Sequence, residues 1–421
     1  MTSPSISFSH QSMLVLDASY TLEMIQGLGT ENSVTCRDLD GFFRHVWTVH
    51  PFATLLTSET WSPRYGKPVW HDMGPRHHFI EGKVGRFGWL SFLFPVNFLI
   101  GQIGLFFTLW ALIRREDIQV IRVGDPLYLG MFGLALSRLT GIPLMIRVNS
   151  NNDKTRKDAG APLYPQLFKS ERVERVIERF IFPRAAMVAA PSSENLEFAL
   201  SAGARKEVTT IFRYGNLLAA EHLVEPGERG LDHVLLAKLG IEQDKFLLSV
   251  GRLEPVKFPE DCVHTLSELR KRGYDLKLIF AGEGKLESTL REQAERLGVT
   301  EWVIFAGNQA QRELAQLNTH SAVVLSPLTG RALSESGLGA SAIVAYDLDW
   351  QSELIENDKT GFLIPFRNKD RFVDAVEKMI IKPSLKRRMG TAVRKRALSI
   401  LDPEKLNEHE RCEYRRILGL G

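Results

Sequence analysis

The sequence predicts an α/β protein built from two successive doubly wound halves. Short runs rich in β-branched residues alternate with longer amphipathic segments, which is typical of parallel sheets covered by helices. This alternation is broken between Tyr214 and Gln243, where EPGERG (225–230) indicates an exposed loop, and it then restarts. We therefore place a domain junction there, with domains at 1–213 and 214–402.

The expected elements follow this alternation through both halves. In such folds ligands bind at the carboxyl ends of the strands, so two halves facing each other predict an interdomain cleft. In the first half we expect strands at 12–17, 45–50, 118–123, 143–148, 187–190 and 208–212, with helices at 128–139, 170–181 and 193–202. In the second half we expect strands at 245–251, 276–282, 302–307, 322–327, 342–347 and 361–365, with helices at 259–273, 285–297 and 331–340.

Composition excludes several classes of protein. The chain has 421 residues, of which 44% are hydrophobic and 24% charged, so it is a globular protein of two or three domains. Its net charge of +3 is too small for a protein that grips nucleic acid. Cys36, Cys262 and Cys412 are too few for a disulfide framework. Because the N-terminus also lacks the pattern of a secretory signal, we expect a cytoplasmic protein.

An uncharged segment at 87–113 is long enough to cross a bilayer. The strands expected at 12–17 and 118–123 would have to join the same sheet. A helix that crossed the membrane between them would place them on opposite sides of it, so we favour a buried or surface-lying helix over a span. Such a helix either belongs to the core or forms a monotopic anchor or a groove for a lipid-linked acceptor. A basic run at 382–401 is either a solvated helix face or a lipid contact, which leaves peripheral membrane association open.

The motif VGRLEPVKF follows the first strand of the second half. Gly251 permits a tight turn with open backbone amides, and Arg252 and Lys257 place two cations around it. Cleaving a sugar from a nucleoside diphosphate builds negative charge on the leaving phosphate, which fixed cations stabilise. The alternative is a pair of solvated surface cations.

A second motif, SPLTGRALSESG, places a glycine-bearing loop before a helix. Gly330 allows close approach of the backbone to phosphate oxygens, and Glu335 could accept hydrogen bonds from a ribose diol. The alternative for Glu335 is an acidic residue that answers the helix dipole.

These motifs, taken in order, resemble the nucleotide-binding half of the family 4 retaining glycosyltransferases (glycosyl transferases group 1), which have the two-domain GT-B fold. The resemblance runs from about Phe246 to Ile380 and is carried by VGRLEPVKF, IFAGEGKLESTLREQAERLGV, VIFAGN, AVVLSP, the segment from Gly330 to Glu335, and ELIENDKTGFLIP. It is weaker in the first half, over IRVGDPLYLGMFGLALSRLTGIPLMIRVN.

The resemblance implies roles for particular residues. Arg252 and Lys257 would hold the donor diphosphate during catalysis, and Glu335 would bind the donor ribose. It implies an acceptor-side domain at 1–213, a donor domain at 214–402, and a last helix within 403–421 that crosses back to the first domain. The other donor-binding residues would be Gly251, Gly330, Arg331, Ala332 and Leu333, the last four through backbone amides.

Two positions depart from the family pattern. The family's first glutamate and its histidine are replaced by Pro327 and Gly124, and Arg331 could compensate by adding a cation to the phosphates. Asp125, next to Gly124, either lines the cleft as a catalytic residue or caps the following helix. Arg147 and Asn149, at a strand end, are candidates to face the acceptor or a phosphate.

Other clusters of histidine and acidic residues have weaker interpretations. WHDMGPRHHFIEG (70–82) could hold a metal, but we favour a mobile loop that contributes to acceptor recognition. The Asp-Leu-Asp triplets at 38–40 and 347–349 resemble a metal-holding motif of the other large glycosyltransferase fold, and we expect neither to bind a metal.

The resulting hypothesis is a retaining, metal-independent glycosyltransferase without a cofactor. It would move a sugar from a nucleoside diphosphate donor, a UDP or GDP sugar, to a hydroxyl of a saccharide or lipid-linked acceptor. We expect a cytoplasmic location, with possible peripheral association with the inner face of the membrane. Alternatives are a sugar-nucleotide epimerase or phosphorylase on the same fold, or a catalytically silent binding subunit.

Overall fold

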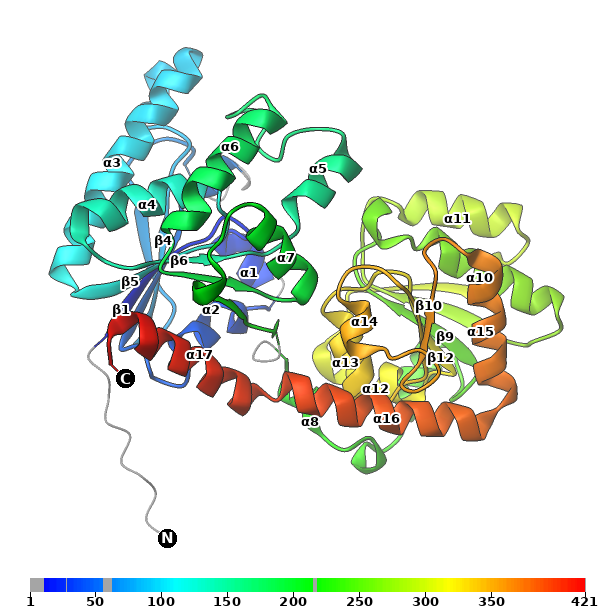
Figure 1. The fold of residues 1–421 in the computed structure, drawn as a ribbon. Coiled ribbons are helices and arrows are strands. Elements are labelled where there is room, and N and C mark those ends of the chain that lie inside the picture. The colour runs from blue at the N-terminus through cyan, green and yellow to red at the C-terminus, as the bar shows by residue number, and fades with distance from the viewer. Residues whose placement is uncertain (1–10, 28, 56–62, 215–217, 421) are drawn as a thin grey trace, which may run out of the picture. The chain divides into compact units, whose positions relative to one another are not determined.

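The chain folds as two compact units. The computed structural model describes residues 11–27, 29–55, 63–214 and 218–420, without the side chains of residues 158 and 159. One unit comprises Met1–Arg213 with Glu404–Gly421, and the other comprises Tyr214–Pro403. Figure 1 shows that each unit has its own sheet with helices on both faces, as the alternating sequence pattern predicts.

The N-terminal unit contains an eight-stranded sheet in the order β3-β4-β2-β1-β5-β6-β7-β8. Neighbouring strands are parallel except for the antiparallel pair β3 and β4. The strands are β1 (Ser12–Leu16), β2 (His45–His50), β3 (Val69–Asp72), β4 (His77–Glu81), β5 (Ile118–Val123), β6 (Leu144–Arg147), β7 (Met187–Ala190) and β8 (Thr209–Ile211).

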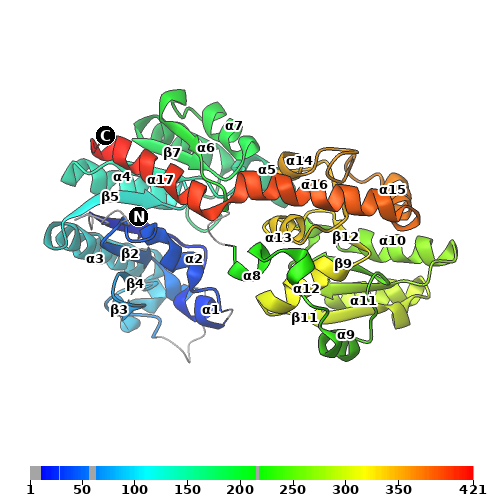
Figure 2. The same cartoon turned by 90° about the horizontal axis from the view of Figure 1, so that it is seen from below.

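Helices cover both faces of this sheet because its strands are apolar on both sides. Leu14 and Leu16 of β1 face the core beneath α3, α4, α6 and α7, whereas Met13 and Val15 face the core beneath α17. Tyr414 of α17 packs against Phe43 and Phe212 in that second core. Figure 2 shows α17 alongside the strands of this sheet. The helices are α1 (Leu22–Gly27), α2 (Asn32–Thr35), α3 (Phe94–Arg115), α4 (Tyr128–Thr140), α5 (Asn152–Ala159), α6 (Glu171–Ile181), α7 (Ser193–Ser201) and α17 (Pro403–Leu418).

The C-terminal unit contains a parallel six-stranded sheet in the order β11-β10-β9-β12-β13-β14. Its strands are β9 (Phe246–Val250), β10 (Lys277–Ala281), β11 (Val303–Gly307), β12 (Val323–Ser326), β13 (Ile343–Tyr346) and β14 (Phe362–Ile364). Its helices are α8 (Ala220–Leu223), α9 (His233–Leu239), α10 (Glu260–Lys271), α11 (Glu287–Arg296), α12 (Gln311–His320), α13 (Ala332–Leu338), α14 (Gln351–Leu354), α15 (Lys369–Ile381) and α16 (Pro383–Leu401).

The segment 70–82, expected as a loop, is instead largely the hairpin β3–β4 at the edge of the N-terminal sheet. Its histidines break the apolar pattern expected of a strand, and two of them are accommodated by partners outside the hairpin, Trp47 and Asp38. The His78 ring stacks on Trp47 at 3.9 Å, and its Nδ1 lies 2.7 Å from Asp72. His77 and His71 lie near different carboxylates, and no group of three or more metal ligands occurs in the described part of the chain.

The apolar segment forms a 3-10 helix, η3 (Gly88–Leu93), followed by α3. The chain enters this segment from β4 and leaves it into β5, and both strands belong to the same sheet, in which β5 also pairs with β1. Leu105, Leu109 and Leu112 bury the inner side of α3 against that sheet, and the opposite side is exposed. This is the surface-lying helix that the topology argument favours.

The basic run at 382–401 lies on α16, and several of its side chains have partners inside the C-terminal unit. Arg394 donates to the carbonyl oxygens of Leu338 and Leu223. Arg396 donates to Glu353 O at 2.8 Å, and Lys386 donates to Ser321 O at 2.9 Å. These residues therefore stabilise the unit, which weakens the interpretation of this run as a lipid contact.

Candidate donor-binding site

The turns after β9 and β10 pack closely at the carboxyl edge of the C-terminal sheet. Gly251 and Gly282 have φ of +141° and +146°, which favour glycine. A Cβ atom on Gly282 would lie 2.2 Å from Gly251 O. The Gly251 amide donates to Ala281 O at 3.0 Å. The backbone at the end of β9 is therefore fixed by its neighbour strand.

Lys257 lies beside Gly330. It follows Gly251 through the 3-10 turn Pro255–Lys257, and a Cβ atom on Gly330 would lie 3.2 Å from Lys257 Nζ. Burial and the nearby positive charge of Arg252 lower the pKa of Lys257, against the opposing effect of Asp349. The structure thus brings together the two cations and the glycine loop that the sequence singles out. A bound anion would relieve the repulsion between these cations.

Gln351 holds the glycine loop in place, although no local motif points to this role. Its buried side chain donates to Pro327 O and to Tyr346 O, each at 3.0 Å. Ser326 Oγ donates to Gln351 Oε1 at 2.6 Å. The segment around Pro327, where the family glutamate is missing, is therefore anchored through its backbone by a buried amide.

The loop presents backbone amides near Lys257. Leu333 is the exception, because its N–H donates to Gly330 O at 3.1 Å. Within the described residues, the amides of Gly330, Arg331 and Ala332 have no acceptor. Since α13 is only 7 residues long, we attribute anion affinity here to these amides and the adjacent cations rather than to the helix dipole.

Glu335 is nearly inaccessible and lies one turn into α13. Its carboxylate oxygen Oε1 is 3.5 Å from Arg331 Nε. A carboxylate held in this way keeps acceptor capacity for a second donor. The position of Glu335 is compatible with binding the donor ribose, a role that stays a prediction. The same ion pair means that Arg331 contacts Glu335 in addition to any bound phosphate.

At the carboxyl edge of the N-terminal sheet, Gly124 lies beside Asp17 and Asn149. A Cβ atom on Gly124 would lie 3.5 Å from both Asp17 Oδ1 and Asn149 Nδ2. Asp17 forms an ion pair with Arg37 at 2.5 Å. The sequence interpretation missed Asp17 and Arg37, although Asp17 directly follows the first strand. A larger side chain at position 124 would encounter this polar cluster.

Asp125 bonds within the N-terminal unit in a way that fits its capping interpretation. Its Oδ1 accepts from the Leu127 amide at 2.7 Å and its Oδ2 accepts from the Tyr164 hydroxyl at 2.9 Å. Burial raises the pKa of Asp125 to about 6, although these hydrogen bonds oppose the shift. Its catalytic role stays a prediction.

Arg147 and Asn149, two residues apart, have different surroundings. Arg147 is buried with its guanidinium 5.7 Å from the centre of the Phe212 ring, whereas Asn149 is more exposed and donates to Gly124 O at 2.9 Å. The structure therefore places Asn149, but not Arg147, in the cluster around Gly124.

The raised pKa of Asp125 predicts a pH dependence of stability. Because the folded state holds this proton more tightly than the unfolded state, the stabilisation is complete below the ordinary aspartate pKa and is lost as pH rises through about 6. We expect Asp125→Asn to flatten the fall in the free energy of unfolding between about pH 4.5 and about pH 6.5, measured by urea denaturation.

Asp17→Asn is the matched control for this experiment. Burial alone would raise the pKa of Asp17, but the Arg37 charge and hydrogen bonds from Ser19 lower it to about 2. The stabilisation that ionised Asp17 contributes is present above the ordinary aspartate pKa and is lost as pH falls towards 2. Between about pH 4.5 and about pH 6.5, Asp17→Asn should therefore leave the slope of the free energy of unfolding against pH nearly unchanged. If the free energy of unfolding fell equally steeply with pH in the wild type and in Asp125→Asn, the raised pKa of Asp125 would be contradicted.

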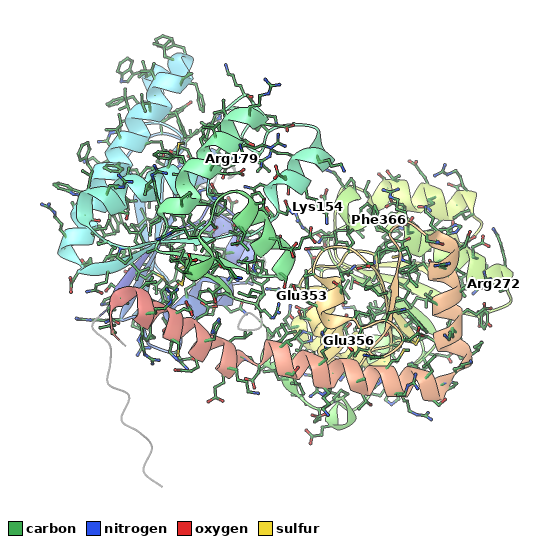
Figure 3. All side chains as sticks on the ribbon, viewed as in Figure 1. Lys154, Arg179, Arg272, Glu353, Glu356 and Phe366 are labelled. Carbon is green, nitrogen blue, oxygen red and sulfur yellow. The ribbon has the colours of Figure 1, made fainter. Side chains whose placement is uncertain are left out.

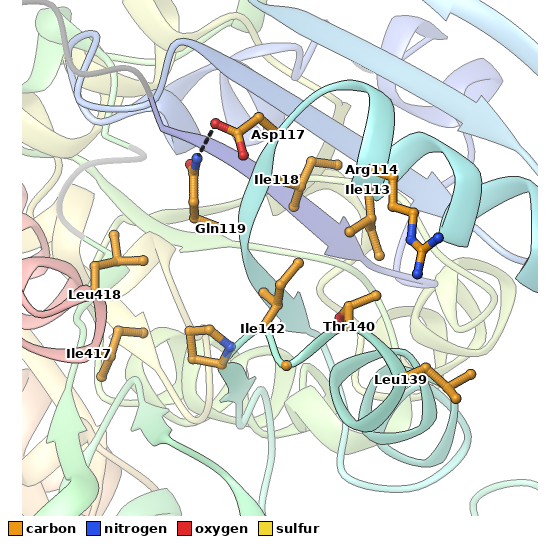
Figure 4. A pocket seen from close by; sticks show the side chains of 12 residues that line it. Ile113, Arg114, Asp117, Ile118, Gln119, Leu139, Thr140, Ile142, Ile417 and Leu418 are labelled. Carbon is orange, nitrogen blue, oxygen red and sulfur yellow. Dashed lines mark hydrogen bonds between the residues drawn. The ribbon is translucent and has the colours of Figure 1, made fainter.

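A pocket of about 480 Å³ lies away from these candidate residues, at the starts of β5 and β6. It is lined by Ile118, Gln119, Ile142 and Leu418, among others (Figure 4). The amino ends of parallel strands lie opposite the edge where ligands bind in such sheets. We therefore do not assign this pocket to the donor.

Comparison with known proteins decides the nature of the C-terminal unit. Residues 235–396 match the model of the family described as glycosyl transferases group 1. The C-terminal unit carries a group 1 glycosyltransferase domain. This group 1 domain contains Gly251, Arg252, Lys257 and the whole glycine loop.

The curated relatives of the chain are glycosyltransferases. It is 24% identical to the alpha-D-kanosaminyltransferase of Streptomyces kanamyceticus, over 61% of this chain and 66% of that protein. It is 30% identical to a GDP-mannose-dependent phosphatidylinositol monomannoside mannosyltransferase of Mycobacterium tuberculosis, over 35% of this chain and 41% of that protein. The chain thus matches at most about two thirds of the length of these two relatives.

Solved structures identify the fold as GT-B. Anabaena HepE in complex with UDP matches 95% of this chain and 98% of its own, with a TM-score of 0.67 and 17% identity. The sucrose-phosphate synthase of Thermosynechococcus elongatus matches 98% of this chain and 100% of its own, with a TM-score of 0.72 and 14% identity. These similarities confirm the predicted fold class, with its two α/β domains.

Proposed function

We propose that this chain transfers a sugar from a nucleoside diphosphate donor to a hydroxyl of a saccharide or lipid-linked acceptor. The observation that carries this proposal is the position of Lys257 Nζ beside Gly330, within the electrostatic influence of Arg252. Two cations next to open amides suit a diphosphate, whose negative charge grows as the sugar leaves. The group 1 domain around them and the relatives' names support this reaction class.

The proposed reaction retains the configuration of the sugar and needs no metal. Arg252 and Lys257 would supply the positive charge that a metal supplies in other transferases, and the amides of Gly330, Arg331 and Ala332 would orient the phosphate oxygens. In a front-face reaction the leaving phosphate takes the acceptor proton, so no protein nucleophile is required at Gly124 or Pro327. Transfer that is unchanged by EDTA and gives a product of retained anomeric configuration would support these features.

The proposed donor is a UDP or GDP sugar. A structural relative was solved with UDP and with UDP-glucose, and a curated relative is named for GDP-mannose. The acceptor class follows relatives named for acceptors that are lipid-linked, among them a diphospho-undecaprenol saccharide.

Nucleotide binding tests this proposal directly. A thermal-shift screen should show stabilisation by UDP or GDP but not by the corresponding nucleosides, since the site is built for the diphosphate. A ligand at 100 times its dissociation constant stabilises the folded state by about 2.7 kcal/mol. Equal shifts with a nucleoside and its diphosphate would contradict the assignment of the site to a diphosphate.

Turnover separates transfer from the alternative reactions. Incubation with the bound nucleotide sugar and a panel of acceptors should give a glycosylated product. An epimerised donor formed without acceptor would identify an epimerase, and diphosphate binding without turnover would identify a silent subunit. Either result would overturn the proposed transfer.

A further inference from the structure

One side of α3 and η3 exposes an apolar ridge, defined here as Phe87, Trp89, Phe92, Leu93, Val96, Leu99, Ile103 and Phe107. Trp89 and Phe92 are 72% and 76% exposed. Val96, Leu99, Ile103 and Phe107 recur at helical spacing, so they form one stripe along α3. Figure 1 shows the N-terminal end of α3, which follows η3, projecting beyond the sheet of the N-terminal unit. A continuous exposed apolar surface of this kind marks an interaction site.

Polar side chains tie the helix into its own unit. The Asn97 amide is fully buried, accepts from the backbone amides of Arg86 and Phe87, and donates to Phe87 O at 2.6 Å. Gln102 donates to Pro51 O at 3.1 Å. By length and composition η3 and α3 are sufficient to cross a membrane, but these bonds and the buried leucines commit the inner side of α3 to the protein. The outer side remains available to a partner.

The charges around the apolar ridge are mainly positive. η3 and α3 contain no acidic residue, and Arg114 lies 4.2 Å above the Trp110 ring at the far end of α3. A pocket of about 570 Å³ adjoins the ridge, with Lys67 and Arg86 among apolar side chains that include Trp70, Phe87 and Ile100. Two cations beside an aromatic wall suit the phosphate and upper chain of a lipid.

The same charge pattern continues over α4 and α6, which follow α3 across this face of the sheet. α6 exposes Phe180 beside Arg179, which is labelled in Figure 3. The carboxylates of Glu174 and Glu178 on this helix are buried against Arg156. Arg175 is paired with Glu171 and Asp153, so the exposed positive charge of α6 comes from Arg172 and Arg179. These exposed arginines therefore extend the positive charge beside the apolar ridge and complement an anionic surface.

We propose that the N-terminal unit docks on an anionic lipid bilayer through the apolar ridge, with Lys67 and Arg86 facing the headgroups. The aromatic side chains would enter the interface between headgroups and acyl chains, while α3 lies along the surface without crossing it. This docking does not depend on the proposed sugar transfer, since it uses none of the donor-site residues.

Vesicle sedimentation of the full chain tests the proposal. Binding should be stronger to phosphatidylcholine vesicles containing about one quarter phosphatidylglycerol than to phosphatidylcholine alone, and high salt should weaken it. The double variant Trp89→Glu/Phe92→Glu should lower the affinity for these vesicles by about tenfold or more. Lys67→Ala and Arg86→Ala should each lower the affinity for these vesicles about fivefold. Val234→Glu is the matched control, because Val234 is 79% exposed on α9 of the other unit.

Several outcomes would overturn the proposal. Undiminished binding of the double variant, with unchanged circular dichroism, would show that another surface holds the membrane, and absence of wild-type binding would remove the docking altogether. A lipid-free dimer that the double variant dissociates would make the ridge a subunit interface. Resistance of the bound protein to alkaline carbonate would indicate a span. Nucleotide thermal shifts of the same variants report separately on the donor site.

Discussion

Replacing Arg252 or Lys257 with alanine is expected to lower the rate of sugar transfer by roughly 10² to 10³. Each substitution removes one of the two charges next to the glycine loop, while negative charge develops on the departing diphosphate. Lys257 lies 3.2 Å from the Cβ position of Gly330, so its ammonium group is within reach of anything bound by that loop. The measurement is kcat and kcat/KM for transfer, with Kd for the nucleotide diphosphate determined in parallel.

Arg272→Ala is the matched control for the loss of a positive charge. Arg272 belongs to the same unit and is paired with Asp374 and Glu377 on the surface (Figure 3). We expect near-wild-type transfer from this variant. If Arg252→Ala and Lys257→Ala also retained near-normal transfer and nucleotide affinity, the two side chains would not form the diphosphate site.

Gly282→Ala is expected to destabilise the C-terminal unit by about 3 kcal/mol or more. The new methyl group would overlap Gly251 O, which is 2.2 Å from its position, and the contacted atom is backbone. The φ of +146° adds strain for any residue with a side chain. Because the clash displaces Gly251, donor binding should be lost together with stability. Urea denaturation followed by circular dichroism measures the first effect, and nucleotide-induced thermal shift measures the second.

Gly298→Ala separates backbone strain from the clash. Gly298 also has positive φ, +68°, but a Cβ atom there would meet nothing within 4 Å. We expect a loss of about 1 kcal/mol, from strain alone, with donor binding retained. Equal losses for the two variants would mean that the turns after β9 and β10 can separate without cost.

The parallel core of each unit was predictable because its strands are buried on both faces and are therefore apolar throughout. Segments such as KFLLSVG and LKLIFAG are identifiable as strands without knowledge of their neighbours. The hairpin β3–β4 was not predictable, since its strands carry histidines whose partners, Trp47 and Asp38, come from distant positions. An edge strand of this kind is stabilised by contacts that the local pattern does not contain.

The candidate site divides in the same way. Gly251, Lys257 and Gly330 belong to local motifs, so their chemistry could be proposed from residue type and spacing. Gln351, which anchors the loop after β12, and the ion pair between Asp17 and Arg37 had no such signal. Gln351, Asp17 and Arg37 belong to the candidate sites because particular strand ends lie side by side. Strand order is a property of the tertiary fold and not of the local sequence.

By itself, the sequence determined the α/β class, the alternation of strands and helices, and the residues able to bind a diphosphate, because these depend on short-range pattern and on the chemistry of single side chains. The tertiary structure alone decided that Lys257 lies against Gly330 and that α3 buries one side and exposes the other. The physical reason is that both outcomes depend on long-range packing, in which chain segments far apart in sequence compete to cover the same strands.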